Sequence, residues 1–234
     1  MRRFLATLRH DLLLQLRYGF LYAGIFVTLF WIAILSLFSS ESLRVALPVF
    51  MFLNASITTI FFVAGWVLYE KREGVLEALV VTPLRHSHYL ASKITVLTGL
   101  AAVETLAIAL LGWGTDLQLL PVVVGIVGIG VINTLFGLLI VFRYDSVNEF
   151  LLPAGLFSTF LQLPVVATLG VLETNLFYLW PTQGPLLLLQ AGFQPITQAD
   201  TIYALLCSTL WIVGAAWLAR SSFARFIVRS EGTA

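Results

Sequence analysis

The sequence predicts an all-α integral membrane protein with six transmembrane helices, and three observations lead to this prediction. Of its 234 residues, 59% are hydrophobic and only 11% are charged, whereas an ordinary soluble domain has about 25% charged residues. The mean hydropathy is +0.97. Six apolar stretches are long enough to cross a bilayer, which takes about 20 helical residues. This composition excludes a cytosolic globular enzyme, because so short a chain could not bury that much apolar surface. It also argues against an outer-membrane barrel, whose polar lumen keeps the chain more polar.

The first element, over residues 1–17, is expected to be an amphipathic helix. At 100° per residue, Leu5, Leu8 and Leu12 fall on one face, with Arg3 and Arg17 opposite. A basic amphipathic helix of this kind lies along a membrane interface. A plain basic anchor ahead of the first span is the alternative, and it is compatible with the same pattern.

Charged residues mark the limits of the six predicted spans. Each span lacks Asp, Glu, Lys, Arg and His, except that Glu104 lies near the middle of the third. The predicted spans cover residues 18–40, 45–69, 94–115, 117–142, 150–172 and 201–219.

Residues 174–199 are also uncharged, but they differ from the spans in kind. They contain three prolines and several glutamines, and their best apolar core, Leu186 to Leu189, is far too short to cross a bilayer. We expect a re-entrant or interfacial excursion on the extracytoplasmic side before the last span. Such irregular backbone is tolerated where protein or water satisfies its polar groups.

The distribution of Lys and Arg predicts the orientation. Twelve of the 13 basic residues fall on one side of the predicted spans, and only Arg44 falls on the other. Cytoplasmic loops carry the excess of Lys and Arg. Both termini are therefore expected in the cytoplasm.

The most informative polar segment, residues 70–93, reads EKREGVLEALVVTPLRHSHYLASK. As a helix it would carry Glu70, Glu73 and Glu77 on one face and an apolar patch on another. Pro83 ends this helix and pushes the residue before it towards extended geometry. A short amphipathic helix across the end of a bundle suits docking into a groove on a partner. A solvated connector whose charges fix the topology is equally compatible.

This segment resembles the signature of the type-2 ABC exporter permeases: EKREGVLE is followed by a leucine, by TPL and, about ten residues on, by a lysine. In that family the stretch forms the coupling helix that contacts the ATPase, which implies a coupling helix at residues 70–83. The order of interfacial helix, six spans and re-entrant region is similar too. Size and bare permease form are similar to the small permeases of bacterial and archaeal multidrug exporters, including the quinolone type. This similarity implies the inner or plasma membrane of a prokaryote. The resemblance gives the coupling role to Glu70, Arg72, Glu73, Gly74, Leu76, Glu77, Leu79, Thr82, Pro83 and Lys93.

No G-x-x-x-x-G-K-[ST] motif occurs in the chain, so it has no phosphate-binding loop of its own. We therefore expect a transport subunit that is not itself an enzyme and needs no cofactor. The resemblance implies a separate ABC ATPase subunit that binds ATP. It also implies a second permease copy or a sister permease, since such transporters use about twelve spans. The lipid bilayer completes the expected partners, and no nucleic acid is expected.

Glu104 is the main candidate for chemistry within the membrane. A carboxylate at that depth costs on the order of 2.5–3.5 kcal/mol or more and normally faces the bundle interior or water. It is either a substrate or proton site, or a hydrogen-bonded residue that holds helices together through Asn133 or Thr134. Asn54, Asn133 and Gln162 are further candidates for pathway lining or for packing.

A metal site is not expected. His86 and His88 lie in a basic loop without nearby Cys or carboxylate residues, and two such histidines do not make a typical zinc site.

The sequence thus predicts the permease subunit of an ABC exporter for an amphipathic or apolar substrate, such as a drug. Two alternatives stay open. One is an ATPase-independent secondary transporter that uses Glu104 for protons, and the other is a membrane scaffold that transports nothing.

Overall fold

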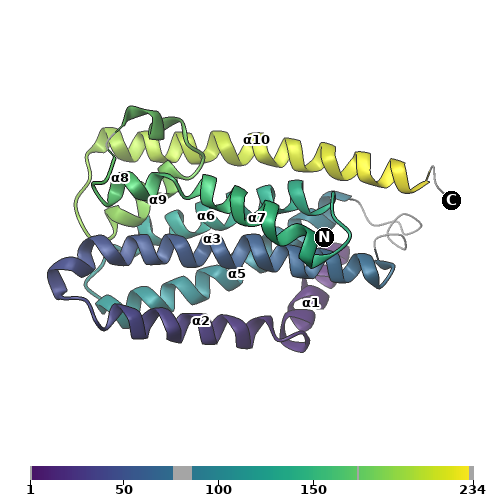
Figure 1. The fold of residues 1–234 in the computed structure, drawn as a ribbon, viewed down its shortest axis with the longest axis horizontal. Helices are drawn as coiled ribbons and strands as arrows, with labels where there is room; N and C mark the ends of the chain where they lie inside the picture. The colour runs from purple at the N-terminus through teal and green to yellow at the C-terminus, as the bar shows by residue number, and fades with distance from the viewer. Residues whose placement is uncertain (1, 76–85, 173, 232–234) are drawn as a thin grey trace.

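The computed structural model describes residues 2–75, 86–172 and 174–231, and every regular element in these ranges is helical (Figure 1). Long helices run side by side in a bundle, and short helices gather at one of its ends. In chain order the elements are α1 (Arg2–Arg17), α2 (Phe20–Leu35), α3 (Ser40–Arg72), α5 (His86–Trp113), α6 (Leu119–Val141), α7 (Val147–Leu161), α8 (Pro164–Thr168), the 3-10 helix η1 (Asn175–Leu179), α9 (Gln183–Ala191) and α10 (Gln198–Glu231).

Four of the described helices are long and apolar enough to cross a membrane. These stretches are Ser40–Arg72, Ser87–Trp113, Leu119–Val141 and Gln198–Phe223, and they belong to α3, α5, α6 and α10. The number rises to five if α1 and α2, a pair bent by 63°, form one span. The chain is therefore a multi-pass helical membrane protein, as its composition predicts. By length and composition the described helices provide four or five spans, not the predicted six. The reason is that two of the predicted spans are not continuous helices.

The first predicted span, residues 18–40, holds only the 16-residue helix α2. Gly19 adopts a φ of +80°, which glycine does without strain, and the chain bends there between α1 and α2. At the other end, Ser39 caps α3 by accepting a hydrogen bond from the backbone N–H of Ser42. Serine is a preferred N-cap residue, so the uncharged residues 36–39 form a turn and not the end of a span.

The fifth predicted span, residues 150–172, is broken between α7 and α8. Proline inside a helix removes one hydrogen bond and clashes with the carbonyl four residues earlier, and α8 begins at Pro164. Side chains from residues 174–199 satisfy the carbonyls at this break. Trp180 Nε1 donates to the carbonyl of Phe160 at 2.7 Å, and Thr182 Oγ1 donates to that of Leu161 at 2.5 Å.

Residues 174–199 contain η1 and α9, and α9 packs against α6 and α10. The approach to α6 is close because Gly125 has no side chain: a Cβ there would lie 2.9 Å from the carbonyl oxygen of Pro185. Gly184 allows the same approach to α10, since its Cβ would lie 2.6 Å from the carbonyl oxygen of Ala204. The segment is thus packed into the bundle as a short helix, and its depth in the bilayer stays a prediction.

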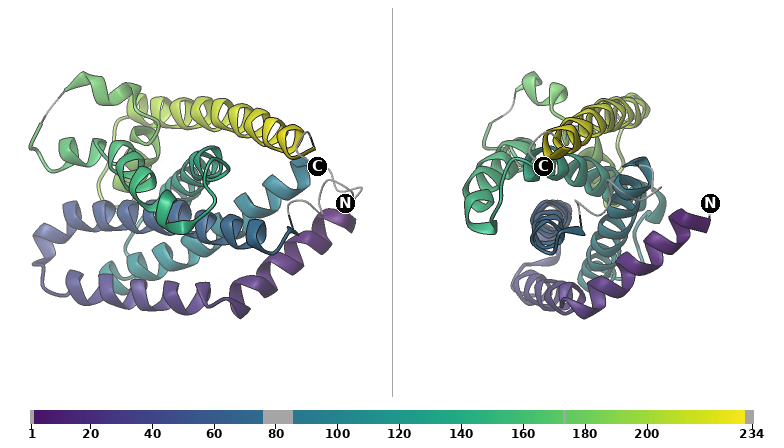
Figure 2. Two further views of the ribbon diagram at one scale, coloured as in Figure 1. Left: turned by 45° about the vertical axis from the view of Figure 1, so that its right-hand side comes forward. Right: turned by 90° about the vertical axis from the view of Figure 1, so that its right-hand side faces the viewer.

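Helix α3 lies at the centre of the arrangement. Seen along the bundle, it is surrounded by α2, α5, α6 and α7 (Figure 2, right), all of which pack against it. Its buried side chains belong to both of the large hydrophobic clusters of the described chain.

The two ends of the bundle differ in charge. One end, which we call the basic end, holds Arg17, Lys71, Arg72 and Arg143, near the last turn of α3 and the turn after α6 (Figure 1). The turn between α2 and α3, α8 and α9 lie at the opposite end. This placement agrees with the asymmetry in the sequence, and the cytoplasmic location of the basic end stays a prediction.

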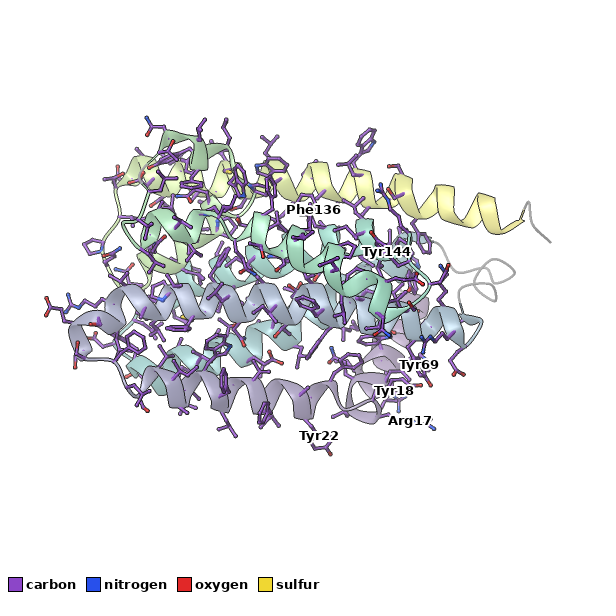
Figure 3. The ribbon with its side chains drawn as sticks, viewed as in Figure 1. Arg17, Tyr18, Tyr22, Tyr69, Phe136 and Tyr144 are labelled. Atoms are coloured by element: carbon purple, nitrogen blue, oxygen red, sulfur yellow. The ribbon has the colours of Figure 1, made fainter. Side chains whose placement is uncertain are left out.

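Tyrosines also gather at the basic end (Figure 3). The rings of Tyr18 and Tyr69 lie 4.4 Å apart between centroids, and Lys71 contacts the carbonyl oxygen of Tyr144 at 3.1 Å. Aromatic residues at this level of a helical bundle are typical of a membrane–water interface.

Candidate functional site

The structure describes about half of the residues to which the sequence assigns the coupling role. Leu76, Glu77, Leu79, Thr82 and Pro83 lie outside the described residues, so their role stays a prediction.

The predicted helix start at Glu70 differs from the structure. Glu70 and Arg72 lie in the last turn of α3, Glu73 follows as its C-cap, and Gly74 adopts a φ of +69°. A glycine in the left-handed region is a common helix terminator, so α3 ends at the glycine and not at the first charged residue. Arg72 and Glu73 are exposed at the basic end, whereas Glu70 is buried.

Glu70, Lys93 and Asp11 form a buried ion cluster that joins three helices, and we call it the Lys93 cluster. The Nζ atom of Lys93 on α5 lies 2.9 Å from Asp11 Oδ1 on α1. It also pairs with Glu70 Oε1 on α3. All three residues are buried: Lys93 is 0% exposed, Asp11 is 2% exposed and Glu70 is 5% exposed. The cluster therefore links α1, α3 and α5 through charges that are shielded from solvent.

Hydrogen bonds complete the Lys93 cluster. Ser92 Oγ donates to Asp11 Oδ2 at 2.6 Å. Tyr89 OH donates to Glu70 Oε2 at 2.7 Å, and Trp66 Nε1 donates to Glu70 Oε1 at 2.9 Å. All four carboxylate oxygens thus have a partner, which is the condition under which buried charges are tolerated.

The aromatic rings of the cluster add to this environment. Lys93 Nζ lies 4.0 Å from the centre of the Trp66 ring and 5.2 Å from that of Tyr89. An ammonium group over an aromatic face is attracted by the ring quadrupole, more strongly where water is excluded. With two carboxylates and one ammonium, the cluster has a formal net charge of −1.

A second polar cluster lies farther along α5 and contains Glu104, which is 4% exposed. Thr58 Oγ1 on α3 donates to Glu104 Oε2 at 2.8 Å. Asn54 Nδ2 on α3 donates at 3.1 Å to Oγ1 of Thr105, the residue that follows Glu104 on α5. Among the described residues, Glu104 Oε1 has no hydrogen-bond partner. It points at Gly24 on α2, where an added Cβ would lie 1.8 Å away.

Asn133 does not meet Glu104, contrary to one of the expectations from sequence. Its Nδ2 atom donates to Ser56 Oγ at 3.3 Å and to the carbonyl of Ile129 at 2.9 Å. The physical reason is the geometry of α3: residues two apart on a helix point in nearly opposite directions. Ser56 therefore faces α6, whereas Asn54 and Thr58 face α5.

Gln162 also lies apart from Glu104. It donates through Nε2 to Ser158 Oγ at 2.8 Å, four residues back at the end of α7. Of the four residues predicted to line a pathway or to pack helices, the structure thus brings Asn54 and Glu104 into one cluster and leaves Asn133 and Gln162 elsewhere.

Comparison with known proteins assigns the chain to a family. The model of the fluoroquinolones export permease protein family matches residues 2–231. The chain belongs to this family. The resemblance to the small quinolone-type permeases, based on size and bare permease form, is thereby confirmed.

Two curated relatives of this permease are similar over almost their whole length. They are the fluoroquinolones export permease proteins of Mycobacterium tuberculosis strains CDC 1551 / Oshkosh and ATCC 25618 / H37Rv. Each is 36% identical to the permease over 239 residues, with 99% of both chains covered.

Sequence reasoning identified only part of the permease's Lys93 cluster. It selected Glu70 and Lys93, but it missed Asp11, Trp66, Tyr89 and Ser92. One signal was present. Asp11 is the one acidic residue of α1, and Gln15 follows it at the i+4 position on the same face.

The predicted apolar face of α1 packs only in part into the permease bundle. Leu8 packs against a buried hydrophobic cluster of the bundle. Leu12 and Leu16 are 48% and 52% exposed, whereas Asp11 and Gln15 are buried. Gln15 Nε2 donates to the backbone carbonyl of Val96 on α5 at 3.3 Å. Asp11 and Gln15 on the polar face of α1 therefore meet protein, and Leu12 and Leu16 point outward, as in a helix that borders lipid.

Proposed function

We propose that this permease is the transmembrane subunit of an ABC exporter that moves an amphipathic or apolar compound, such as a fluoroquinolone, out of the cell. The family match over residues 2–231 is the observation that carries this proposal. The names of the two curated relatives support it. A separate ATPase subunit supplies the energy, because the chain has no phosphate-binding loop. Two permease copies, or this chain and a sister permease, enclose the pathway.

The ATPase docks on the segment that follows α3 at the basic end. Arg72 and Glu73 are exposed there and are available to a partner. Closure of the ATPase on ATP displaces this segment, and α3 and α5, which flank it, carry the displacement into the bundle. The pathway then changes from inward to outward access. This mechanism follows the family resemblance together with the exposed charges at the end of α3.

An amphipathic or apolar substrate is favoured by the character of the helices. In each of the four helices that are long and apolar enough to cross a membrane, the apolar stretch of 18 residues holds at most two Asp, Glu, Lys or Arg residues. These helices therefore offer little fixed charge to an ion. Glu104 is the one carboxylate of α5, and one of its oxygens already accepts a hydrogen bond from Thr58.

The test is drug accumulation in an efflux-deficient bacterial host. We expect fluoroquinolone accumulation to fall only when the permease and its ATPase are produced together, and to recover when the Walker A lysine of the ATPase is replaced. Tagged permease should also co-purify with that ATPase.

Two results would contradict the proposal. Efflux by the permease alone, abolished by a protonophore and by Glu104→Gln, would instead establish a proton-driven transporter. Unchanged accumulation together with an absent ATPase in the purified material would leave only a scaffold role.

A further inference from the structure

We propose that Asp11, Glu70 and Lys93 are positioning residues that fasten α1 to α3 and α5, so that the permease transmits the motion of its coupling segment to α1. This inference rests on the proposed function, because the ATPase is the source of that motion. It changes the role of Glu70 and Lys93, which the family resemblance places in contact with the ATPase.

Burial excludes Glu70 and Lys93 from a surface contact in the described structure. Glu70 is 5% exposed and Lys93 is 0% exposed, whereas the neighbouring Arg72 and Glu73 are exposed. The carboxylate of Glu70 is already occupied by Lys93, Tyr89 and Trp66. A docking partner would have to break these bonds to reach it.

The positions of Glu70 and Lys93 in the chain give the pair a mechanical meaning. Glu70 lies in the last turn of α3, and Lys93 lies in the second turn of α5. Their ion pair therefore joins the two ends of the segment that links these helices. A force on that segment acts on α3 and α5 together and does not separate them.

Asp11 extends this unit to α1. Its two carboxylate oxygens contact Lys93 Nζ at 2.9 Å and Ser92 Oγ at 2.6 Å, both on α5. The backbone link from α1 to α2 runs through Gly19, which has a φ of +80° and whose Cβ position is open, with nothing within 4 Å. Helix α1 is thus held to α5 by buried charges and by the hydrogen bond from Gln15 to Val96, and a sharp turn links it to α2.

Asp11→Asn is the variant that tests this role. It keeps the side-chain shape and leaves the Lys93–Glu70 pair in place, so the cluster changes from a formal charge of −1 to 0 and the fold is retained. Lys93 variants are unsuitable, because they leave two buried carboxylates without a counter-ion.

The measurement is the amount of fluoroquinolone exported per ATP hydrolysed, in proteoliposomes that contain the permease and its ATPase. For Asp11→Asn we expect this ratio to fall on the order of tenfold, a typical size for a coupling between two sites. The amount of folded permease, its association with the ATPase and the basal ATP hydrolysis should stay at wild-type values. A purely structural role would lower the amount of folded protein and leave the ratio unchanged.

A cysteine pair provides a rescue. In the double variant Asp11→Cys and Ser92→Cys, the reduced protein should be uncoupled like Asp11→Asn. A short bifunctional thiol reagent that joins the two cysteines should restore the ratio, because it fastens α1 to α5 again. The single variant Asp11→Cys, treated with the same reagent, is the control for the native Cys207.

Either of two outcomes overturns the inference. One is a wild-type ratio for Asp11→Asn, and the other is a cross-linked protein that binds ATPase but exports nothing, which would mean that α1 must leave α5. The measurement on wild-type protein distinguishes failure of this inference from failure of the proposed function. If wild-type protein shows no ATPase-dependent export, the proposed function fails, and the positioning role fails with it.

Discussion

The carboxylate of Glu104 on α5 occupies the space that Gly24 on α2 leaves free. An added Cβ at Gly24 would lie 1.8 Å from Glu104 Oε1 and 2.7 Å from the carboxyl carbon. Thr58 holds the other oxygen at 2.8 Å, so the carboxylate cannot retreat without losing a hydrogen bond. The pair explains why α2 and α5 approach closely at this level.

We expect Gly24→Ala to lower the free energy of unfolding by about 1–3 kcal/mol, the cost of a lost buried hydrogen bond. The measurement is thermal or denaturant unfolding of the purified permease in detergent. In a Glu104→Ala background the obstructing atoms are gone, so the same change at Gly24 should cost almost nothing. Strictly additive effects in this double-mutant cycle would contradict the contact.

Thr58 and Thr59 form a matched pair for testing the Glu104 hydrogen bond. Both are buried, at 3% and 0% exposure. However, Thr59 Oγ1 donates within its own helix, to the carbonyl of Ala55 at 2.7 Å and to that of Ser56 at 3.3 Å. Thr58→Val should cost about 1–3 kcal/mol in unfolding free energy because it leaves a buried carboxylate oxygen unpaired. Thr59→Val should cost clearly less, and equal losses would rule out a special role for Thr58.

Gly184→Ala should force α9 away from α10. Its Cβ would lie 2.6 Å from the backbone carbonyl of Ala204, and backbone atoms cannot rotate aside. Overpacking of this kind costs about 1–3 kcal/mol, and we expect a lower melting temperature together with reduced export. Gly214→Ala on α10 is the control, since nothing lies within 4 Å of that Cβ position. A melting temperature unchanged by Gly184→Ala would contradict the close approach.

Lys93→Met should be among the most destabilising single changes at the basic end. It removes the counter-ion of two buried carboxylates, which typically costs about 3–5 kcal/mol. The control is Asp145→Asn, which breaks the 2.5 Å ion pair with Lys71 at a side chain that is 81% exposed. Exposed pairs contribute about 0–1 kcal/mol. The yield of folded protein and its melting temperature report the difference, and similar losses for both variants would argue against a buried cluster.

Charge reversal at Glu73 addresses the proposed ATPase contact. Glu73 is exposed directly after α3, so Glu73→Lys should leave the permease in the membrane at wild-type amounts while reducing ATPase binding and export. Glu149→Lys, an equivalent reversal at an exposed site of the same end, should have little effect. Retained ATPase association and export in Glu73→Lys would show that this residue does not take part in coupling.

The long helices were predictable from sequence, whereas their interruptions were not. Charged residues mark where a chain leaves hydrocarbon, and this located the apolar cores of α3, α5, α6 and α10. The breaks at Gly19 and Pro164 lie inside uncharged stretches. There the backbone preference of one residue, or the capping of freed carbonyls by Trp180 and Thr182, determines the outcome.

The polar clusters were predictable as single residues but not as pairs. Glu70, Lys93, Asn54 and Glu104 are conspicuous because polar groups in apolar surroundings need partners. Which partners they find depends on helix packing. Asp11 and Lys93 are 82 residues apart in the chain, and no local pattern relates them.

The two polar clusters also restrict how α5 can move. Lys93 and Glu104 are eleven residues apart, which is about three full turns, so they lie on nearly the same face of α5, about 16 Å apart along its axis. Both contact α3, through Glu70 and Thr58. Spinning α5 about its own axis would break both contacts together. If α5 instead tilts or slides together with α3, both contacts are kept. We therefore expect α3 and α5 to move as a single rigid unit.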